Sequence, residues 1–224
     1  MTFLFGKTEN GLAIEGHRFG KTGAHVFVLG GVHGDEVEGV ILAGALLASL
    51  LEPNSLYSLN LRLTLVPCFN VDGVLAKTRG NSRGVDLNRN LPTKDWSSTA
   101  TTARYQPGPS PLSESENKAL VKFLELERPD FIISLHSWKP MLNINEPEGS
   151  TLCGDVAKKI AAVTGDIIEP TIGYSTPGCL GTYAAFERHI PTITYEIERG
   201  MAPKTIISTH LPALFDGLRV LETT

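Results

Sequence analysis

One segment, residues 25–51, constrains the fold more than any other part of the chain. The apolar run His25–Val32 has the composition of a buried strand in a parallel sheet. A turn containing three glycines, Gly30–Glu36, separates it from the aliphatic and alanine-rich segment Val37–Leu51. Two glutamates at the start of that segment suit the positive end of a helix dipole. A buried strand, a tight turn and an apolar helix in this order are typical of α/β folds.

The rest of the chain alternates in the same way. Strands are expected at Asn60–Phe69, Phe131–His136 and Ile190–Ile197, where apolar and β-branched residues dominate. Helices are expected from Ser113 to Glu127, opened by a capping box at Ser113–Glu116, and from Leu211 to Leu221. We therefore expect a single α/β domain over residues 1–224, with a central mixed, mostly parallel sheet flanked by helices.

Charge and composition argue against several classes of protein. The formal net charge is −4 and the sequence has no basic stripe, so a nucleic-acid binder is not expected. No stretch reaches the roughly 18 uninterrupted apolar residues of a membrane span, and the first residues do not read as a signal peptide. The widely spaced Cys68, Cys153 and Cys179 fit neither a disulfide framework nor a zinc knuckle. We expect a bacterial cytoplasmic protein, of an oligomeric state that the sequence does not indicate.

Two histidines and a carboxylate form a candidate metal site. His33 and Glu36 lie three residues apart in the turn after the first strand, and His136 ends the run Phe131–His136. In open α/β sheets, ligands bind in the crevice beyond the carboxyl ends of the strands. A His₂Glu set placed there leaves one coordination position open for water. Either histidine alone is better explained as a hydrogen-bonded core residue, but the three residues together favour a metal.

Glu196 is the second candidate for chemistry. It interrupts the β-branched strand segment Thr192–Ile197, where burying an unpaired carboxylate would cost several kcal/mol. A general base beside a metal site is one reason to place a carboxylate there. A salt bridge to Arg199 is the structural alternative. Glu198 competes for the same role, because residues two apart share one face of a strand.

The long stretch Val71–Pro111 supplies cations. It is rich in Gly, Pro, Asn, Ser and Thr, and a loop region of this length is usually functional. Its guanidinium groups at Arg79, Arg83 and Arg89 can bind a carboxylate or stabilise an oxyanion. At least one of the three is expected to be a solvated charge. Asp86 can serve a metal indirectly, by accepting the free ring N–H of a zinc histidine.

These residues give the chain a clear resemblance to the zinc carboxypeptidase family, and within it to the small bacterial murein peptide amidases. The resemblance runs in order from Gly30 to about Arg199. It rests on Gly31-Val32-His33-Gly34-Asp35-Glu36, Pro67–Gly73, Gly84–Pro92, Ser134-Leu135-His136-Ser137, Thr194-Tyr195-Glu196-Ile197 and the loop Gly173–Tyr183. In that loop Cys179 stands where a serine is more usual.

The resemblance implies a zinc carboxypeptidase-like fold, one zinc ion and a set of roles. Carried over residue by residue, it implies that His33, Glu36 and His136 are zinc ligands, that Asp86 orients the first zinc histidine, and that Glu196 rather than Glu198 is the catalytic base. It also implies that Asn88 and Arg89 bind the substrate's terminal carboxylate and that Tyr174 is the mobile tyrosine of the specificity loop. Arg79 is the implied oxyanion stabiliser, with Arg83 as the alternative.

The implied activity is zinc-dependent hydrolysis of an amide bond next to a carboxylate-bearing terminal residue. A muropeptide is the implied substrate, cut at the γ-D-glutamyl–meso-diaminopimelate bond during recycling of cell-wall peptides. A general metallocarboxypeptidase remains open, as does a deacylase of the succinylglutamate desuccinylase or aspartoacylase type, which usually lacks the wording at Tyr174–Gly181. A peptide-carboxylate binding module is the non-enzyme alternative. Loss of a metal ligand or of the catalytic glutamate would have indicated a binding module, and the sequence has lost neither.

Overall fold

The computed structural model describes residues 1–53, 58–100 and 102–223. The strands are β1 (Thr2–Lys7), β2 (Ala13–Phe19), β3 (His25–Gly30), β4 (Arg62–Val66), β5 (Phe131–Trp138), β6 (Met141–Asn145), β7 (Ile167–Glu169) and β8 (Thr192–Glu198). The longer helices are α1 (Val37–Leu51), α2 (Val71–Ala76), α3 (Ser115–Glu127), α4 (Leu152–Thr164) and α6 (Leu211–Val220). Short helical segments are η1 (Leu87–Arg89), η2 (Ala103–Tyr105), η3 (Thr182–Phe186), α5 (Pro203–Thr205), η4 (Ile206–His210) and η5 (Leu221–Thr223).

All of these strands belong to one sheet, in the order β1-β2-β4-β3-β5-β8-β6-β7. The central strands β4, β3, β5 and β8 run parallel to one another. Antiparallel pairing occurs between β1 and β2, between β2 and β4, and between β8 and β6. The predicted mixed, mostly parallel sheet is therefore confirmed. Strands from both halves of the chain share it, which agrees with the single domain that we predict.

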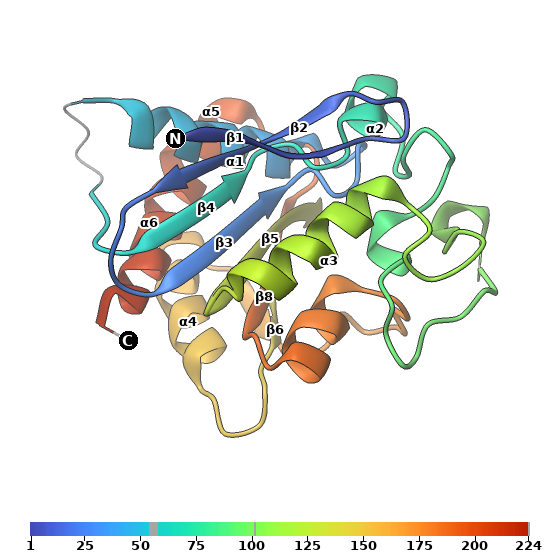
Figure 1. Ribbon diagram of the computed structural model, residues 1–224. Helices are drawn as coiled ribbons and strands as arrows, with labels where there is room; N and C mark the ends of the chain where they lie inside the picture. The colour runs from blue at the N-terminus through green and yellow to red at the C-terminus, as the bar shows by residue number, and fades with distance from the viewer. Residues whose placement is uncertain (54–57, 101, 224) are drawn as a thin grey trace.

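The central strands are buried on both faces, because helices cover both sides of the sheet (Figure 1). Along β3, Val26 and Val28 belong to the core shared with α1, α4 and α6. Phe27 and Leu29 point the other way, into the core shared with α3. The period of two along a strand explains why a strand covered on both faces reads as a continuous apolar run.

The sequence placed most of the central elements correctly. Helix α1 has the predicted bounds, and β4, β5, β8, α3 and α6 lie within a few residues of theirs. Strand β3 ends two residues early, at Gly30, because Gly31 takes a positive φ of 68°. The sequence analysis did not identify β1, β2, β6, β7 or α4. It also treated Val71–Ala76 as loop, whereas these residues form α2.

The predicted capping box at Ser113–Glu116 is wrong. Helix α3 begins at Ser115, and its N-cap residue Glu114 makes no side-chain cap hydrogen bond. The carboxylate of Glu9, from the β1–β2 turn, instead accepts from the Ser115 amide at 2.7 Å. Ser113 donates to Glu114 at 2.6 Å, and Glu116 accepts from the Glu9 amide. A distant segment therefore supplies the cap that the local pattern predicted.

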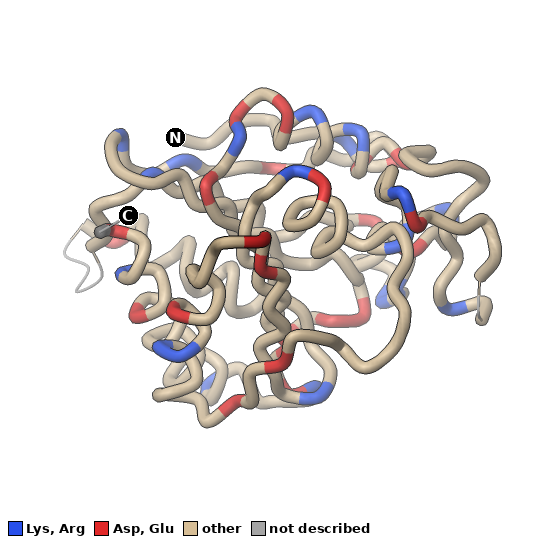
Figure 2. The backbone as a smooth tube through the Cα atoms, turned by 90° about the horizontal axis from the view of Figure 1, so that it is seen from below, with Lys and Arg blue, Asp and Glu red and all other residues tan. Residues whose placement is uncertain are grey.

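Basic and acidic residues are interspersed along the chain, without a continuous stripe of one sign (Figure 2). Within the described residues, no helix combines the length and the apolar character needed to cross a bilayer.

Candidate active site

The predicted residues meet at the carboxyl ends of the central parallel strands. His33 follows β3, His136 lies near the end of β5, and Glu196 lies near the end of β8. They border a cavity of about 380 Å³. Its lining includes Arg79, Asn88, Arg89, Arg104, Tyr105, Trp138, Asn143, Asn145, Tyr174, Cys179 and Arg199. A crevice at this edge of the sheet is the usual ligand site of open α/β folds.

The turn that carries His33 and Glu36 is held tightly against helix α2. A Cβ on Gly34 would lie 2.0 Å from the carbonyl carbon of Gly73, so only glycine allows this approach. Asn70, completely buried, donates from its amide to the carbonyl oxygens of Val32 and Arg79, each at 3.3 Å. The Pro67–Gly73 motif therefore positions the turn that carries two of the candidate ligands.

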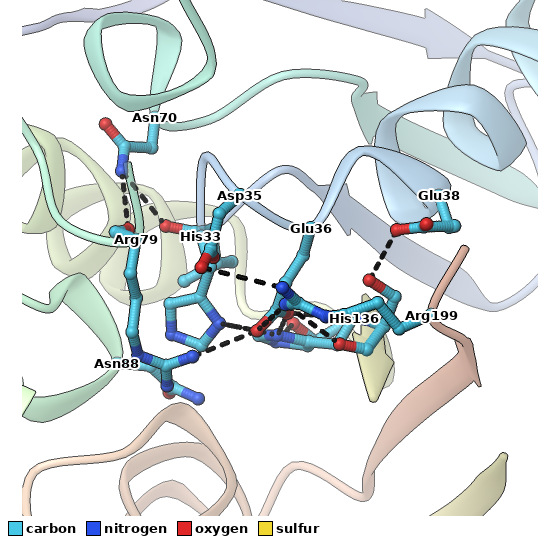
Figure 3. Close-up of polar contacts among 12 residues, drawn as sticks. His33, Asp35, Glu36, Glu38, Asn70, Arg79, Asn88, His136 and Arg199 are labelled. Atoms are coloured by element: carbon cyan, nitrogen blue, oxygen red, sulfur yellow. Dashed lines mark hydrogen bonds and ion pairs between the residues drawn. The ribbon is translucent and has the colours of Figure 1, made fainter. Parts of the chain in front are cut away.

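Three buried side chains converge as a candidate metal centre (Figure 3). His33 Nδ1 lies 3.0 Å from Glu36 Oε1, and His136 Nδ1 lies 2.9 Å from Glu36 Oε2. The two Nδ1 atoms are 3.1 Å apart. On the far side of its ring, His136 Nε2 lies 2.9 Å from Ser134 Oγ. One nitrogen of each ring and the Glu36 carboxylate thus face a common point.

This donor set fits a zinc ion. The Asp86 carboxylate is fully buried; His33 and Arg79 outweigh the effect of burial and lower its pKa. It is therefore a hydrogen-bond acceptor, and the bond of 3.0 Å from His33 Nε2 places the ring proton on that nitrogen. The lone pair of Nδ1 then faces the Glu36 carboxylate and the Nδ1 atom of His136. Lone pairs in contact repel one another unless a cation lies among them, and two imidazoles with one carboxylate are a known zinc ligand set.

The charges around the three groups also favour a cation. Burial alone would raise the pKa of Glu36, but His33 and His136 lower it well below its usual range. Burial alone would lower the pKa of His33, but Glu36 and Asp86 raise it. The carboxylates that favour a proton on His33 would equally favour a divalent ion at its Nδ1 atom.

Arg79 links the candidate ligands to their support. Its Nη1 donates to Glu36 Oε1 at 2.9 Å, and its Nε donates to Asp86 Oδ2 at 2.8 Å. The side chain is 10% exposed and lines the cavity. Arg83, in contrast, is 47% exposed and lies 3.8 Å from Glu9 and from Glu114, outside the cavity lining. Of the two arginines that the sequence left open, only Arg79 faces the candidate metal centre.

Glu196 is a buried carboxylate without a full set of partners. Within the described residues, its Oε2 atom has no hydrogen-bond partner, and no ion pair to Arg199 forms. Burial raises its pKa to about 7, and the negative Glu36 nearby adds to this shift. Glu198, two residues on, lies exposed at the end of the strand. The structure thus places Glu196, and not Glu198, in the cavity.

Asn88 and Arg89 reach the cavity from η1. The Asp86 side chain accepts from the Asn88 amide at 2.9 Å, so the residue that contacts His33 also starts this short helix. The Asn88 side-chain oxygen accepts from the Leu180 amide at 2.8 Å. The guanidinium of Arg89 lies over the Tyr105 ring at 5.2 Å and donates to the Asn88 carbonyl oxygen. These contacts hold both side chains in place, and their remaining N–H groups can donate to a ligand.

Aromatic side chains form the rim. Tyr174 is 41% exposed, and its ring packs edge-on against Trp138, with centroids 5.9 Å apart. The Tyr105 ring also lies near Tyr174, with centroids 6.3 Å apart. Cys179 lines the cavity and contacts Thr176 and Thr182 through its sulfur atom. Tyr174 is therefore a half-exposed side chain of the cavity lining that a ligand can contact.

The family model described as zinc carboxypeptidase matches residues 2–201 of the chain. The chain belongs to the zinc carboxypeptidase family. The family and the chemistry of the donor set together imply zinc as the metal.

Individual relatives agree with this assignment. The chain is 32% identical over 197 residues to murein peptide amidase A of Vibrio campbellii, covering 83% of this chain and 74% of that protein. It is 32% identical over 171 residues to murein peptide amidase A of Escherichia coli K12, covering 70% of this chain and 65% of that protein. The crystal structure of murein-tripeptide amidase from Escherichia coli O157 superposes with a TM-score of 0.78 at 26% identity, covering 97% and 91% of the two chains. The family and these relatives indicate a hydrolytic enzyme of the metallopeptidase type.

This zinc carboxypeptidase also contains polar residues at its site that the sequence analysis missed. Buried Glu38 accepts from Ser137 Oγ at 2.6 Å and from the Gly200 amide at 2.7 Å, and so joins α1 to the ends of β5 and β8. Arg104 and Asn143 line the cavity but follow no pattern in the sequence. Of the two tryptophans, Trp138 lines the cavity and Trp96 does not. In the sequence, the only hint of a buried acid in α1 was that Glu38 follows the candidate ligand Glu36 by two residues.

Proposed function

We propose that this zinc carboxypeptidase cleaves the γ-D-glutamyl–meso-diaminopimelate amide bond of murein peptides. The observation that carries the proposal is Glu196, a buried carboxylate with a free oxygen and a raised pKa beside a His-Glu-His donor set. A carboxylate with a pKa near neutrality can accept and return a proton within one reaction. The relatives whose printed names are murein peptide amidase A and murein-tripeptide amidase support the choice of substrate.

His33, Glu36 and His136 would hold one zinc ion through one nitrogen of each imidazole and the carboxylate. When bound, zinc supplies a Lewis acid that lowers the pKa of water and polarises a carbonyl group. Asp86 holds His33 in the tautomer that presents Nδ1 to the ion. Ser134 holds the ring of His136 from the opposite side. The protein thereby orients both imidazoles before the ion binds.

Glu196 is the proposed general base. Its Oε2 atom takes a proton from the attacking water and later passes it to the amine of the leaving diaminopimelate. The pKa of about 7 suits both transfers near neutral pH. Arg79, already fixed by Glu36 and Asp86, presents its remaining N–H groups to the oxyanion that develops on the scissile carbonyl.

Asn88, Arg89 and Tyr174 are proposed to bind the substrate's terminal carboxylate. A guanidinium and an amide can donate several hydrogen bonds to one carboxylate, and the support beneath both side chains limits their freedom. Tyr174, at the rim, can add a further donor. Fixing that carboxylate places the scissile carbonyl against Arg79 and Glu196, which lowers the entropic part of the barrier.

Three tests with the zinc-loaded enzyme distinguish the candidate substrates. The substrates are L-Ala-γ-D-Glu-meso-diaminopimelate, ordinary peptides with free carboxyl ends, and N-acyl amino acids such as succinylglutamate. Release of diaminopimelate at a far higher kcat/KM than turnover of the other two supports the proposal. Preferred turnover of a plain peptide or an acyl amino acid would overturn the substrate assignment. Binding of all three without turnover would indicate a binding module.

The cytoplasmic location stays a prediction from the sequence.

A further inference from the structure

Two arginines of the cavity take no part in the mechanism above. The lining contains Arg79, Arg89, Arg104 and Arg199. Arg79 is bound to Glu36 and Asp86, and Arg89 is assigned to the terminal carboxylate. Arg104 and Arg199 remain, with side chains that are 46% and 40% exposed. Two partly exposed guanidinium groups at the opening of a cavity need an anionic ligand or a structural partner to explain them.

Asp35 holds these two arginines together. Its Oδ2 atom accepts from Arg104 Nη2 at 2.8 Å and lies 3.6 Å from Arg199 Nη1. A guanidinium group carries five N–H donors, so both arginines retain donors beyond their contacts with Asp35. Asp35 directly precedes the candidate ligand Glu36, and Arg199 Nη2 lies 3.5 Å from Glu36 Oε1. The two arginines therefore lie next to the candidate metal centre.

The position of Arg104 and Arg199 relative to Arg79 and Arg89 indicates which part of a substrate they could contact. In Figure 3, Arg79 and Asn88 approach the His33–Glu36–His136 cluster from the left and Arg199 approaches it from the right, and the guanidinium groups of Arg79 and Arg199 both lie near Glu36. If Asn88 and Arg89 bind the carboxylate of the leaving residue, the scissile bond lies at the cluster. The acyl part of the substrate then extends toward Arg199 and Arg104.

We propose that Arg104 and Arg199, positioned by Asp35, bind a free carboxylate on the acyl side of the scissile amide. This inference rests on the function proposed above. In a γ-linked D-glutamyl amide, a three-carbon arm joins the scissile carbonyl to the free α-carboxylate. An α-linked residue with an uncharged side chain offers no anion there. The arginine pair is thus a specificity determinant for γ-glutamyl substrates, since paired guanidinium groups suit planar carboxylates.

The test compares two tripeptides that differ by one charge. The first is L-Ala-γ-D-Glu-meso-diaminopimelate, and the second carries a carboxamide in place of the glutamyl α-carboxylate. We expect the zinc-loaded enzyme to prefer the acid by about tenfold to 100-fold in kcat/KM, as for the loss of one charged hydrogen-bonded contact. In Arg199→Gln and in Arg104→Gln the ratio of acid to amide falls toward one, through KM for the acid. Arg199→Lys retains part of the preference.

A matched control is Arg83→Gln, since Arg83 is equally exposed and paired with glutamates outside the cavity. We expect this variant to keep the wild-type ratio. Equal kcat/KM for both tripeptides in the wild type overturns the inference, as does an equal loss on both substrates in the arginine variants. If neither tripeptide is cleaved, the proposed function fails on its own. Calorimetric titration of both into the zinc-loaded Glu196→Gln protein then decides the inference: tighter binding of the acid supports it, and equal affinity overturns it.

Discussion

His136 and Glu196 are direct register partners on the neighbouring parallel strands β5 and β8. The proposed third metal ligand and the proposed general base are therefore fixed relative to each other by backbone pairing, and not by a loop. Both side chains line the cavity, together with Ser137 and Trp138 of β5 and Thr194 of β8. Sites built on paired strands hold their geometry more closely than sites built on loops. This relationship underlies the predictions that follow.

The His-Glu-His set should bind one zinc ion per chain. His136→Ala and His33→Ala should abolish stoichiometric zinc in protein that is purified with zinc and then dialysed. His189→Asn is the matched control, because His189 is exposed and takes a positive φ of 58° that asparagine tolerates. Elemental analysis of the three variants checks the prediction. Zinc retained by His136→Ala at the wild-type level would contradict it.

Removal of Asp86 should weaken zinc binding without removing a ligand. Asp86→Ala leaves His33 without its acceptor and Arg79 without one of its two carboxylates. Loss of such a supporting carboxylate costs about tenfold to 100-fold in metal affinity. Competition with a chromophoric chelator measures the change. The control is Asp216→Asn, which changes a surface ion pair in α6 and should bind zinc as tightly as the wild type does. An unchanged zinc affinity in Asp86→Ala would contradict the prediction, because it would show that the ring of His33 needs no support from Asp86.

The zinc-free protein should lose stability as pH rises through 7, because of Glu196. The folded pKa of about 7 lies above the ordinary 4.5, so the folded state binds the extra proton between these values. By linkage, the contribution of Glu196 to the free energy of unfolding is largest below pH 4.5 and is lost as pH rises from 4.5 through 7. The full shift corresponds to about 3 kcal/mol as an order of magnitude.

Urea unfolding of the chelator-treated protein at pH 5 and at pH 8 checks this dependence. Glu196→Gln carries no titrating group, so it should match the wild type more closely at pH 5 and exceed it at pH 8. Glu198→Gln, at the exposed end of the same strand, should behave as the wild type at both values. An identical pH dependence in Glu196→Gln and the wild type would contradict the assignment of a raised pKa to this group.

Arg79, and not Arg83, should matter for turnover. Arg79→Gln removes a donor aimed at the scissile carbonyl, and we expect kcat to fall by about 100-fold to 1,000-fold. Arg83→Gln should leave kcat unchanged, because that side chain lies outside the cavity. The comparison is made at equal zinc content, since Arg79 also contacts Glu36. Equal losses in the two variants would reopen the choice between them.

The sequence predicted what strand ends and short-range spacing determine. His33, Glu36, His136 and Glu196 stand beside long apolar runs, so their convergence follows from the order of parallel strands. Strands β1 and β2 were missed because their exposed and buried residues give no strong apolar run. The choice between Arg79 and Arg83 was left open, because neighbouring loop residues point to different sides only once the loop is folded.

Contacts between distant segments were beyond the reach of the sequence. Glu9 caps α3 from 106 residues away, and no local pattern indicates that partner. Asp35 and Arg104 meet across 69 residues, and the η2 segment that carries Arg104 has no periodicity to place it. Asn143 reaches the cavity because β6 pairs antiparallel with β8, next to Thr194. Residues of this kind can be identified only once the strand order and the chain path are known, and no local sequence pattern shows these.

The most direct test of the account is the kcat/KM of the wild type and of Glu196→Gln on L-Ala-γ-D-Glu-meso-diaminopimelate, with zinc measured in both samples. We predict release of diaminopimelate by the wild type, and a loss of at least about 100-fold in the variant at equal zinc content, since general base catalysis contributes at this scale. Turnover by Glu196→Gln at the wild-type rate would contradict the role of Glu196 and, with it, the proposed mechanism.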